Sequence, residues 1–356
     1  MSYFNVKYLA TLLFLSLSLI PTAHALEDDL DQPLEEIKTP EQLALEQKIK
    51  SCVATLKETG FVTGEDKLIY RYCETRILSR GIVPGRLAKR ILNERTTELN
   101  PFVITPHKQS YILPITITDS FNRDVYMFEP ERAEQMKDVE AKYQVSIKVP
   151  LRSSSLFIPG DGLYFAMTIQ AWWQLYADEI SKPFRETNYT PEIFYIAPLP
   201  FNPFDGNMAF AVHLEHQSNG QSQELSRSWN RLLFSVIYEK NDYAFAFKPW
   251  YRFEEEPKEY PLDPKGDDNP DIEDYLGHYE ILAAYAFNDQ HKLSALIRQN
   301  FATGKGALEL NYTFPFPGSS RLVGFAQYFT GYGESLIDYN HKQQKFGLGI
   351  AVNDIF

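Results

Sequence analysis

The chain has 356 residues and a net charge of −12, and this acidic balance argues against nucleic acid as a partner. Aromatic residues make up 14% of the sequence, which is more than a soluble enzyme usually needs. Beyond residue 25 no run of 18 or more apolar residues occurs, so the sequence predicts no helical membrane span, although a lipid partner stays open.

Residues 1–25 are typical of a secretory signal peptide. Lys7 supplies a positive start, a short apolar run follows, and the segment from Ala23 to Ala25 is a small-x-small cleavage site before an acidic stretch. The apolar run is too short for a spanning helix. We therefore expect the mature chain to begin near Leu26 and to lie outside the cytoplasm.

Residues 26–100 are expected to form a periplasmic region, an acidic leader followed by helices. Residues 41–58 and 67–99 carry apolar side chains at helical spacing, and the second segment is interrupted at Gly81 and Pro84. In an oxidising compartment the two cysteines, Cys52 and Cys73, suggest one disulfide that closes a helical hairpin, with free buried thiols as the alternative.

From about Ile104 the hydrophobic period changes to two. Segments rich in Tyr, Phe, Val and Ile recur to the end of the chain, and we expect strands at 105–118, 139–150, 163–176, 186–198, 207–218, 227–239, 242–253, 277–288, 291–302, 305–315, 320–332 and 342–355. An even number of strands of this length suits a bilayer. The sequence therefore predicts an all-β fold for residues 101–356, a twelve-stranded antiparallel transmembrane β-barrel with a small N-terminal helical region.

The lengths of the loops between the strands alternate between short and long, which also suits a barrel. The breaks at 239–242 and 288–291 are tight turns, whereas 254–276 and 331–341 are long, as expected of periplasmic turns and extracellular loops of an outer-membrane barrel. Three alternatives remain at this point: a soluble β-sandwich, a soluble periplasmic lipase, and a passive porin or adhesin-like barrel. The apolar face of a sandwich would point inward at a second sheet, and a soluble lipase would lack outward aromatic bands. A twelve-stranded barrel has a narrow bore that inward charges can fill, which argues against the porin.

Three polar residues fall on the predicted outer face. His216 and Ser218 share the parity of Phe210, Val212 and Leu214 in one strand, and Asn230 shares the parity of apolar residues in the next strand. A hairpin across residues 219–227 brings position 216 roughly opposite 230. Because 239–242 is a periplasmic turn, the loop at 219–227 is extracellular and the three residues lie near the outer leaflet, where polar groups are costly and usually functional.

The chemistry of these residues is that of a hydrolytic group. A serine hydroxyl becomes a nucleophile when an imidazole takes its proton, and an asparagine carbonyl is able to fix the tautomer and orientation of that imidazole. Gly220 is expected to offer a backbone N–H to the oxyanion. The alternative is an ordinary polar hairpin tip.

The same residues carry a family resemblance. The pattern H-x-S-N-G at His216 to Gly220, followed by S-R-S-W-N-R at Ser226 to Arg231, resembles bacterial outer-membrane phospholipase A. Supporting matches are PHKxxYxLP at 106–114, WWQL at 172–175, PFRETNY at 183–189, KPWY at 248–251, DDNPDI at 267–272 and GYGESLIDYN at 331–340. The resemblance covers residues from about 104 to the end.

This resemblance implies an outer-membrane enzyme that cleaves acyl esters of phospholipids, with Ser218 as nucleophile, His216 as base and Asn230 as its orienter. It also implies calcium dependence and an active homodimer. The implied calcium ligands are the Ser226 hydroxyl, the Gln221 carbonyl and the Ser181 carbonyl of the partner subunit, with a weaker site at Asp268. The chain departs from the family where Gln221 replaces an arginine, Gln223 replaces an acidic residue and Ile169 replaces an outward interface glutamine.

Overall fold

The structure is a computed structural model of the chain. It describes residues 40–58, 70, 73–74, 77, 85–152, 155–158, 160–199, 201–260, 263, 265–319 and 321–356. The signal peptide expected at residues 1–25 and the leader up to residue 39 lie outside the described residues. The chain forms two compact units, Met1–Ala44 and Leu45–Phe356, and residues 40–44 are the described part of the first.

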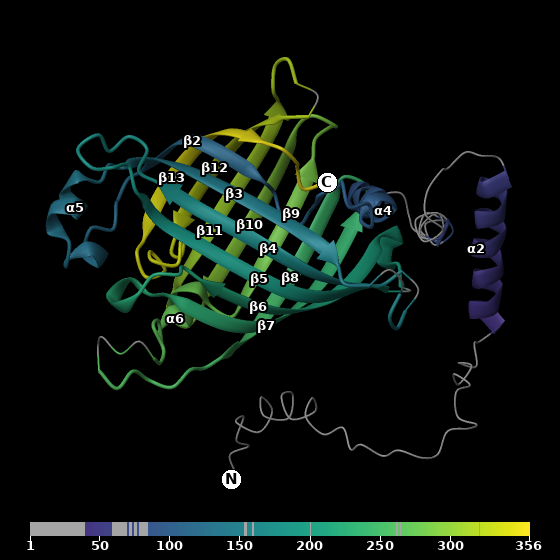
Figure 1. Ribbon diagram of the computed structural model, residues 1–356, viewed down its shortest axis with the longest axis horizontal. Coiled ribbons are helices and arrows are strands. Elements are labelled where there is room, and N and C mark those ends of the chain that lie inside the picture. The colour runs from purple at the N-terminus through teal and green to yellow at the C-terminus, as the bar shows by residue number, and fades with distance from the viewer. Residues whose placement is uncertain are drawn as a thin grey trace, which may run out of the picture. The chain divides into compact units, whose positions relative to one another are not determined.

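The second unit contains a closed antiparallel barrel (Figure 1). Its wall consists of β2 (Tyr111–Thr118), β3 (Val139–Pro150), β4 (Gly162–Trp173), β5 (Phe184–Leu199), β6 (Asn207–Ser218), β7 (Ser228–Lys240), β8 (Tyr243–Phe253), β9 (Tyr279–Ala286), β10 (Lys292–Asn300), β11 (Lys305–Pro315), β12 (Val323–Gly331) and β13 (Gln343–Ala351). The barrel closes because β2 pairs with both β13 and β3, and β3 continues to β4. The prediction of twelve antiparallel strands is confirmed.

The first expected strand, 105–118, is divided in the structure. Thr105–Pro106 forms a separate two-residue strand, β1, against β3, and the barrel strand β2 begins only at Tyr111. Between them the Ser146 side chain, in place of a backbone carbonyl, accepts the Lys108 N–H at 3.0 Å, which interrupts the ladder. The other strand boundaries agree with the expected ones to within a few residues.

Side-chain parity separates the two faces of the wall. Apolar side chains are exposed on the outside, among them Leu214 at 55% and Phe234 at 47%, and the aromatic rings of β8 other than the buried Trp250 are exposed as well. Charged side chains such as Glu140, Lys142 and Lys345 are almost completely buried in the lumen. Fully burying an apolar side chain such as leucine or phenylalanine is worth about 1.5–3 kcal/mol. Exposing the outer apolar band to water would therefore be costly, whereas the acyl chains of a bilayer accept it.

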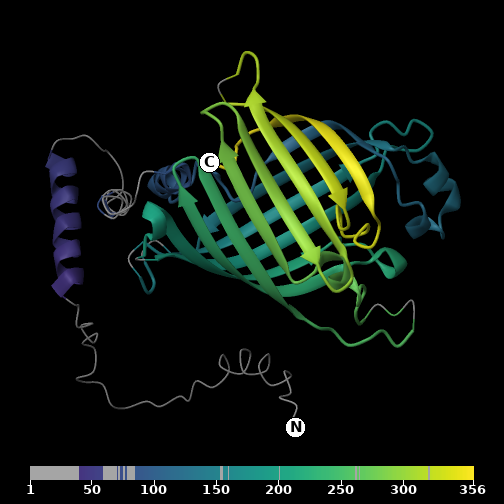
Figure 2. The same ribbon diagram turned by 180° about the vertical axis from the view of Figure 1, so that it is seen from behind.

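The two ends of the barrel differ. The long loops lie at one end with the short helices α5 (Pro130–Gln135) and α6 (Ile272–Leu276), and α4 (Arg86–Thr97) lies at the other (Figure 1). The tight turn between β7 and β8 belongs to the end that carries α4. Figure 2 shows the wall of C-terminal strands that crosses between these ends.

Helix α4 is attached to the barrel through its N-terminus. The Glu239 carboxylate accepts the backbone N–H groups of Leu87 and Ala88 at 2.9 Å each, and Arg86 pairs with Asp242 at 2.6 Å. Unpaired N–H groups and the helix dipole make a helix N-terminus favourable for an anion. The end of β7 and the turn after it therefore anchor the segment that precedes the barrel.

The region before the barrel contains α2 (Pro40–Glu58), which confirms the helix expected at 41–58. Cys52 and Cys73 form a disulfide, as the two-cysteine argument suggested. Part of the second helical segment, residues 86–97, is α4, and most of residues 59–84 lie outside the described part. None of the described helices has the length and apolarity to cross a membrane.

Candidate functional site

The hairpin of β6 and β7 positions the polar group on the outer wall. Residue pairing across the hairpin is Ser218 with Ser228 and His216 with Asn230, as expected from the alternation of the two strands. His216, Ser218 and Asn230 are all partly exposed, whereas their inward neighbours Glu215 and Arg231 are buried. The predicted parity is therefore confirmed.

A hydrogen bond joins two of these side chains. Nδ1 of His216 lies 2.8 Å from Oδ1 of Asn230. An amide oxygen accepts and does not donate, so this contact requires the proton on Nδ1. The imidazole consequently presents Nε2 as a proton acceptor, which is the tautomer that a general base needs.

Ser218 lies two positions further along the same face, about 6.8 Å in strand rise from His216. Among the described residues, neither the Ser218 hydroxyl nor Nε2 of His216 has a hydrogen-bond partner. A nucleophile and base that meet only around bound substrate are common in ligand-free enzymes. The structure thus places the serine beside the base with both reactive atoms available.

The loop after Ser218 is organised by Asn219, a residue that the sequence argument did not single out. Its buried side chain accepts the N–H groups of Gln221 at 3.2 Å and Arg227 at 3.0 Å, and donates to the Leu225 carbonyl at 2.8 Å. Gly220 is exposed and has φ +64°, a conformation that strains other residues. This loop geometry holds Gly220 next to the serine.

Two other sequence motifs support this loop from inside the barrel. Glu186 in β5 accepts the Asn219 amide at 3.2 Å and the Asn188 amide at 2.5 Å. Asn188 in turn accepts the backbone N–H of Leu336, in the loop between β12 and β13, at 2.9 Å. The motifs at 183–189 and 331–340 are therefore structural supports of the hairpin, a role that their sequence did not reveal.

The residues carried over as calcium ligands divide into two groups. The Ser226 hydroxyl donates to Oδ2 of Asp268 at 2.5 Å, so these two positions are brought together, and Gln221 lies on the same loop as Ser226. Ser181 is exposed in the loop between β4 and β5, at the same end of the barrel. Among the described residues no group of three or more His, Cys, Asp or Glu side chains is arranged to hold a metal.

Asp268 has a second partner that the sequence did not indicate. Nζ of Lys258 lies 2.6 Å from Oδ1 of Asp268, and both side chains are largely buried. An ammonium group at this distance neutralises the carboxylate and competes with any other cation. Asp268 is therefore less favourable as an independent calcium site than its sequence position suggested.

Asn230 also has a partner beyond His216. Its amide nitrogen donates to Oε1 of Glu255, in the loop after β8, at 3.1 Å. Partial desolvation by the surrounding loop raises the pKa of the Glu255 carboxyl, and the neighbouring charges of Asp267 and Asp268 raise it further. Position 255 falls in an acidic loop without periodicity, so sequence patterning had no means of placing it here.

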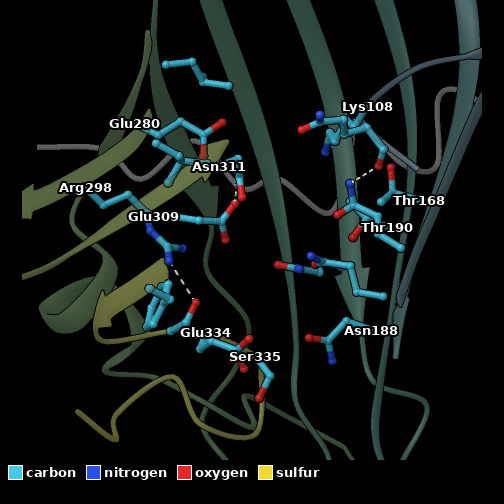
Figure 3. A pocket seen from close by; sticks show the side chains of 18 of the residues that line it. Lys108, Thr168, Asn188, Thr190, Glu280, Arg298, Glu309, Asn311, Glu334 and Ser335 are labelled. Carbon is cyan, nitrogen blue, oxygen red and sulfur yellow. Dashed lines mark hydrogen bonds between the residues drawn. The ribbon is translucent and has the colours of Figure 1, made fainter. Parts of the chain in front are cut away.

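Many charged side chains inside the barrel are paired with one another. An interior cavity of about 320 Å³ is lined by polar and apolar side chains, and the polar ones face each other from opposite walls (Figure 3). The Glu334 carboxylate accepts from Lys142 at 2.8 Å and from Lys345 at 3.0 Å, and Lys248 pairs with Glu280 at 2.9 Å. The expected inward ion pairs are confirmed for Arg231 with Glu215, Lys248 with Glu280 and Arg252 with Asp267, and they narrow the lumen that a porin would need open.

Comparisons with known proteins agree with the geometry. The family model described as Phospholipase A1 matches residues 87–352. A phospholipase A1 from Escherichia coli strain K12 is 36% identical over 276 residues, which cover 77% of this chain and 89% of that protein. A putative phospholipase A1 from Neisseria meningitidis serogroup B is 38% identical over 269 residues, 71% of this chain and 66% of that protein.

Solved structures give the same result. Outer membrane phospholipase A from Escherichia coli superposes with a TM-score of 0.65 at 34% identity, covering 72% of this chain and all of that one. The outer membrane phospholipase dimer of Salmonella typhi with bound calcium has a TM-score of 0.67 at 32% identity, covering 78% of this chain and 99% of that one.

Proposed function

The chain belongs to the phospholipase A1 family, and from this premise we propose that it hydrolyses acyl esters of phospholipids and lysophospholipids at the lipid-facing wall of its barrel. The barrel is integral to the outer membrane, and the family's function is that of an esterase rather than a passive porin. The observation that carries the assignment of the site is the His216–Asn230 hydrogen bond beside Ser218 on the outer face.

The proposed reaction has two halves. The Ser218 hydroxyl attacks the ester carbonyl carbon while Nε2 of His216 takes its proton, and the Asn230 oxygen holds the opposite ring nitrogen. The backbone N–H of Gly220 stabilises the oxyanion. The proton passes from His216 to the departing alcohol, and water then cleaves the acyl-serine by the same route, releasing a fatty acid.

Calcium is the proposed cofactor, held by the Ser226 hydroxyl, the Gln221 carbonyl and the carbonyl of Ser181 of the partner subunit. A hydroxyl and carbonyls are hard oxygen donors of the kind that calcium prefers, so the residues present fit the ion. Ser226 already contacts a carboxylate oxygen in the structure. When bound, the cation would supply positive charge near the oxyanion.

A homodimer is the proposed active form, and this assembly would explain a ligand from a second copy. The Salmonella typhi structure is described as a dimer with bound calcium. Ile169 lies on the outer face of β4, where an apolar side chain suits a contact between barrels in lipid. We further propose the division into a signal peptide at 1–25, a periplasmic region at 26–100 and a phospholipase barrel at 101–356.

The test compares two outward serines that face each other across the hairpin. Purified protein in detergent with calcium should release fatty acid from phosphatidylethanolamine. Ser218→Ala should abolish this release, and Ser228→Ala should retain it, because Ser228 has the same parity but no role in the reaction. A sulfonyl fluoride should label Ser218; equal activity of the two variants, or a label elsewhere, would refute the assignment.

A further inference from the structure

Glu255 completes a chain of contacts that leads to the proposed base. Asn230 pairs with Phe253 at the end of β8, and Glu255 follows two residues later. The Asn230 amide donates to Oε1 of Glu255 at 3.1 Å and accepts from Nδ1 of His216 at 2.8 Å. The two contacts use opposite sides of the same amide.

We propose that Glu255 is a positioning residue of the hydrolytic group, which holds the Asn230 amide so that its oxygen faces His216. The inference rests on the proposed function of Ser218, His216 and Asn230. Glu255 does not contact the reacting atoms. It acts through Asn230 and places a negative charge one residue away from the imidazolium that forms during the reaction.

The physical reason is the asymmetry of an amide. Rotation by 180° exchanges oxygen and nitrogen at almost no steric cost, and it would then point an NH₂ group at the Nδ1 proton of His216. A carboxylate accepts hydrogen bonds and does not donate them, so Glu255 selects the orientation with NH₂ toward itself. An asparagine without such a partner has nothing to select the orientation of its amide. An aspartate in the same place would need no selection, because both of its oxygens accept hydrogen bonds.

The segment that carries Glu255 is held to the opposite limb of its loop. Lys258 pairs with Asp268 at 2.6 Å, and the Glu256 carbonyl accepts the backbone N–H of Asp267 at 2.9 Å. Gly266, with φ +93°, allows the close approach, since a Cβ there would lie 2.8 Å from the Glu256 oxygen. These contacts fix the backbone of a side chain that is itself exposed.

The first experiment measures steady-state phospholipid hydrolysis by Glu255→Ala. Because a hydrogen bond between a neutral amide and an exposed carboxylate is partly screened, we expect kcat to fall about 3- to 10-fold with KM unchanged. Glu254→Ala, an exposed neighbour with the same charge, should behave as wild type. Migration as a folded, heat-modifiable barrel on gels establishes that each variant is assembled.

A double-mutant cycle separates positioning from general loop or charge effects. If Glu255 acts only through the amide, Glu255→Ala should cost nothing further in an Asn230→Ala background. The proposal would be overturned if Glu255→Ala lowered kcat by the same factor in the wild-type and the Asn230→Ala backgrounds, or if it did not lower kcat in the wild-type background. The proposed function fails separately, if Ser218→Ala remains active.

Replacing Asn230 by aspartate should reverse the effect of residue 255 on activity, so that a carboxylate there lowers the rate and an amide raises it. Asn230→Asp should be poorly active with Glu255 present, because two carboxylates 3.1 Å apart repel each other or share a proton. Adding Glu255→Gln supplies an amide donor to the new aspartate, so the double variant should regain at least 3-fold. An Asn230→Asp variant that is indifferent to residue 255 would contradict the proposal.

Discussion

Asn230→Ala is the sharpest test of how the proposed base is held. The substitution removes the oxygen that lies 2.8 Å from Nδ1 of His216 and leaves the serine and imidazole in place. A hydrogen bond to a group that becomes charged is worth about 1.5–3 kcal/mol, and about 1.4 kcal/mol corresponds to a factor of ten in rate. The expected loss in kcat is therefore about 10- to 150-fold.

The assay is the initial rate of fatty-acid release at saturating phospholipid and calcium, with Ser218→Ala as the inactive reference. Leu232→Ala serves as the control, because it truncates the next outward side chain of β7 without touching the hydrogen bond. A loss below 3-fold would show that Asn230 does not orient the base. A folded Asn230→Ala variant as inactive as Ser218→Ala would show that it does more than orient.

Three further predictions concern stability and calcium. Glu334→Gln leaves the buried Lys142 ammonium without its carboxylate partner, while Lys345 keeps Glu140, and the change should destabilise the barrel by about 3–5 kcal/mol in urea unfolding from lipid vesicles; a change below about 1 kcal/mol would refute this. Burial raises the pKa of the Asp161 carboxyl, but three backbone N–H groups outweigh it and hold the pKa below its ordinary value. The Asp161 carboxylate therefore stabilises the fold above the unfolded pKa of about 3.9, and this contribution is lost as pH falls through the lower folded pKa. The difference in free energy of unfolding between wild type and Asp161→Asn should accordingly be full at neutral pH and shrink in acid. Lys258→Met removes an ammonium 2.6 Å from Asp268 and should tighten calcium binding about 10-fold by calorimetry, whereas the exposed Lys265→Met should not; equal affinities would exclude competition by Lys258.

The periodicity of the chain was sufficient for the barrel and for the face on which the polar group lies. Side chains alternate strictly along a strand, so the parity of His216, Ser218 and Asn230 is a local property that any correct strand assignment reveals. The pairing of His216 with Asn230 followed from the shared parity of the two strands on either side of the loop at 219–227. Strand ends were less accurate, as at 105–110, where a side chain of β3 replaces a backbone partner.

What surrounds these three residues was decided by the tertiary structure. Glu255, the lysine partner of Asp268 and the supports of Asn219 come from loops and strands whose order along the chain says nothing about their proximity. The contact of Asn188 with Leu336, for example, joins residues 148 positions apart. Alternation records which face a side chain occupies, but closing the barrel brings distant strands and loops together, and only that closure determines which side chains meet at the site.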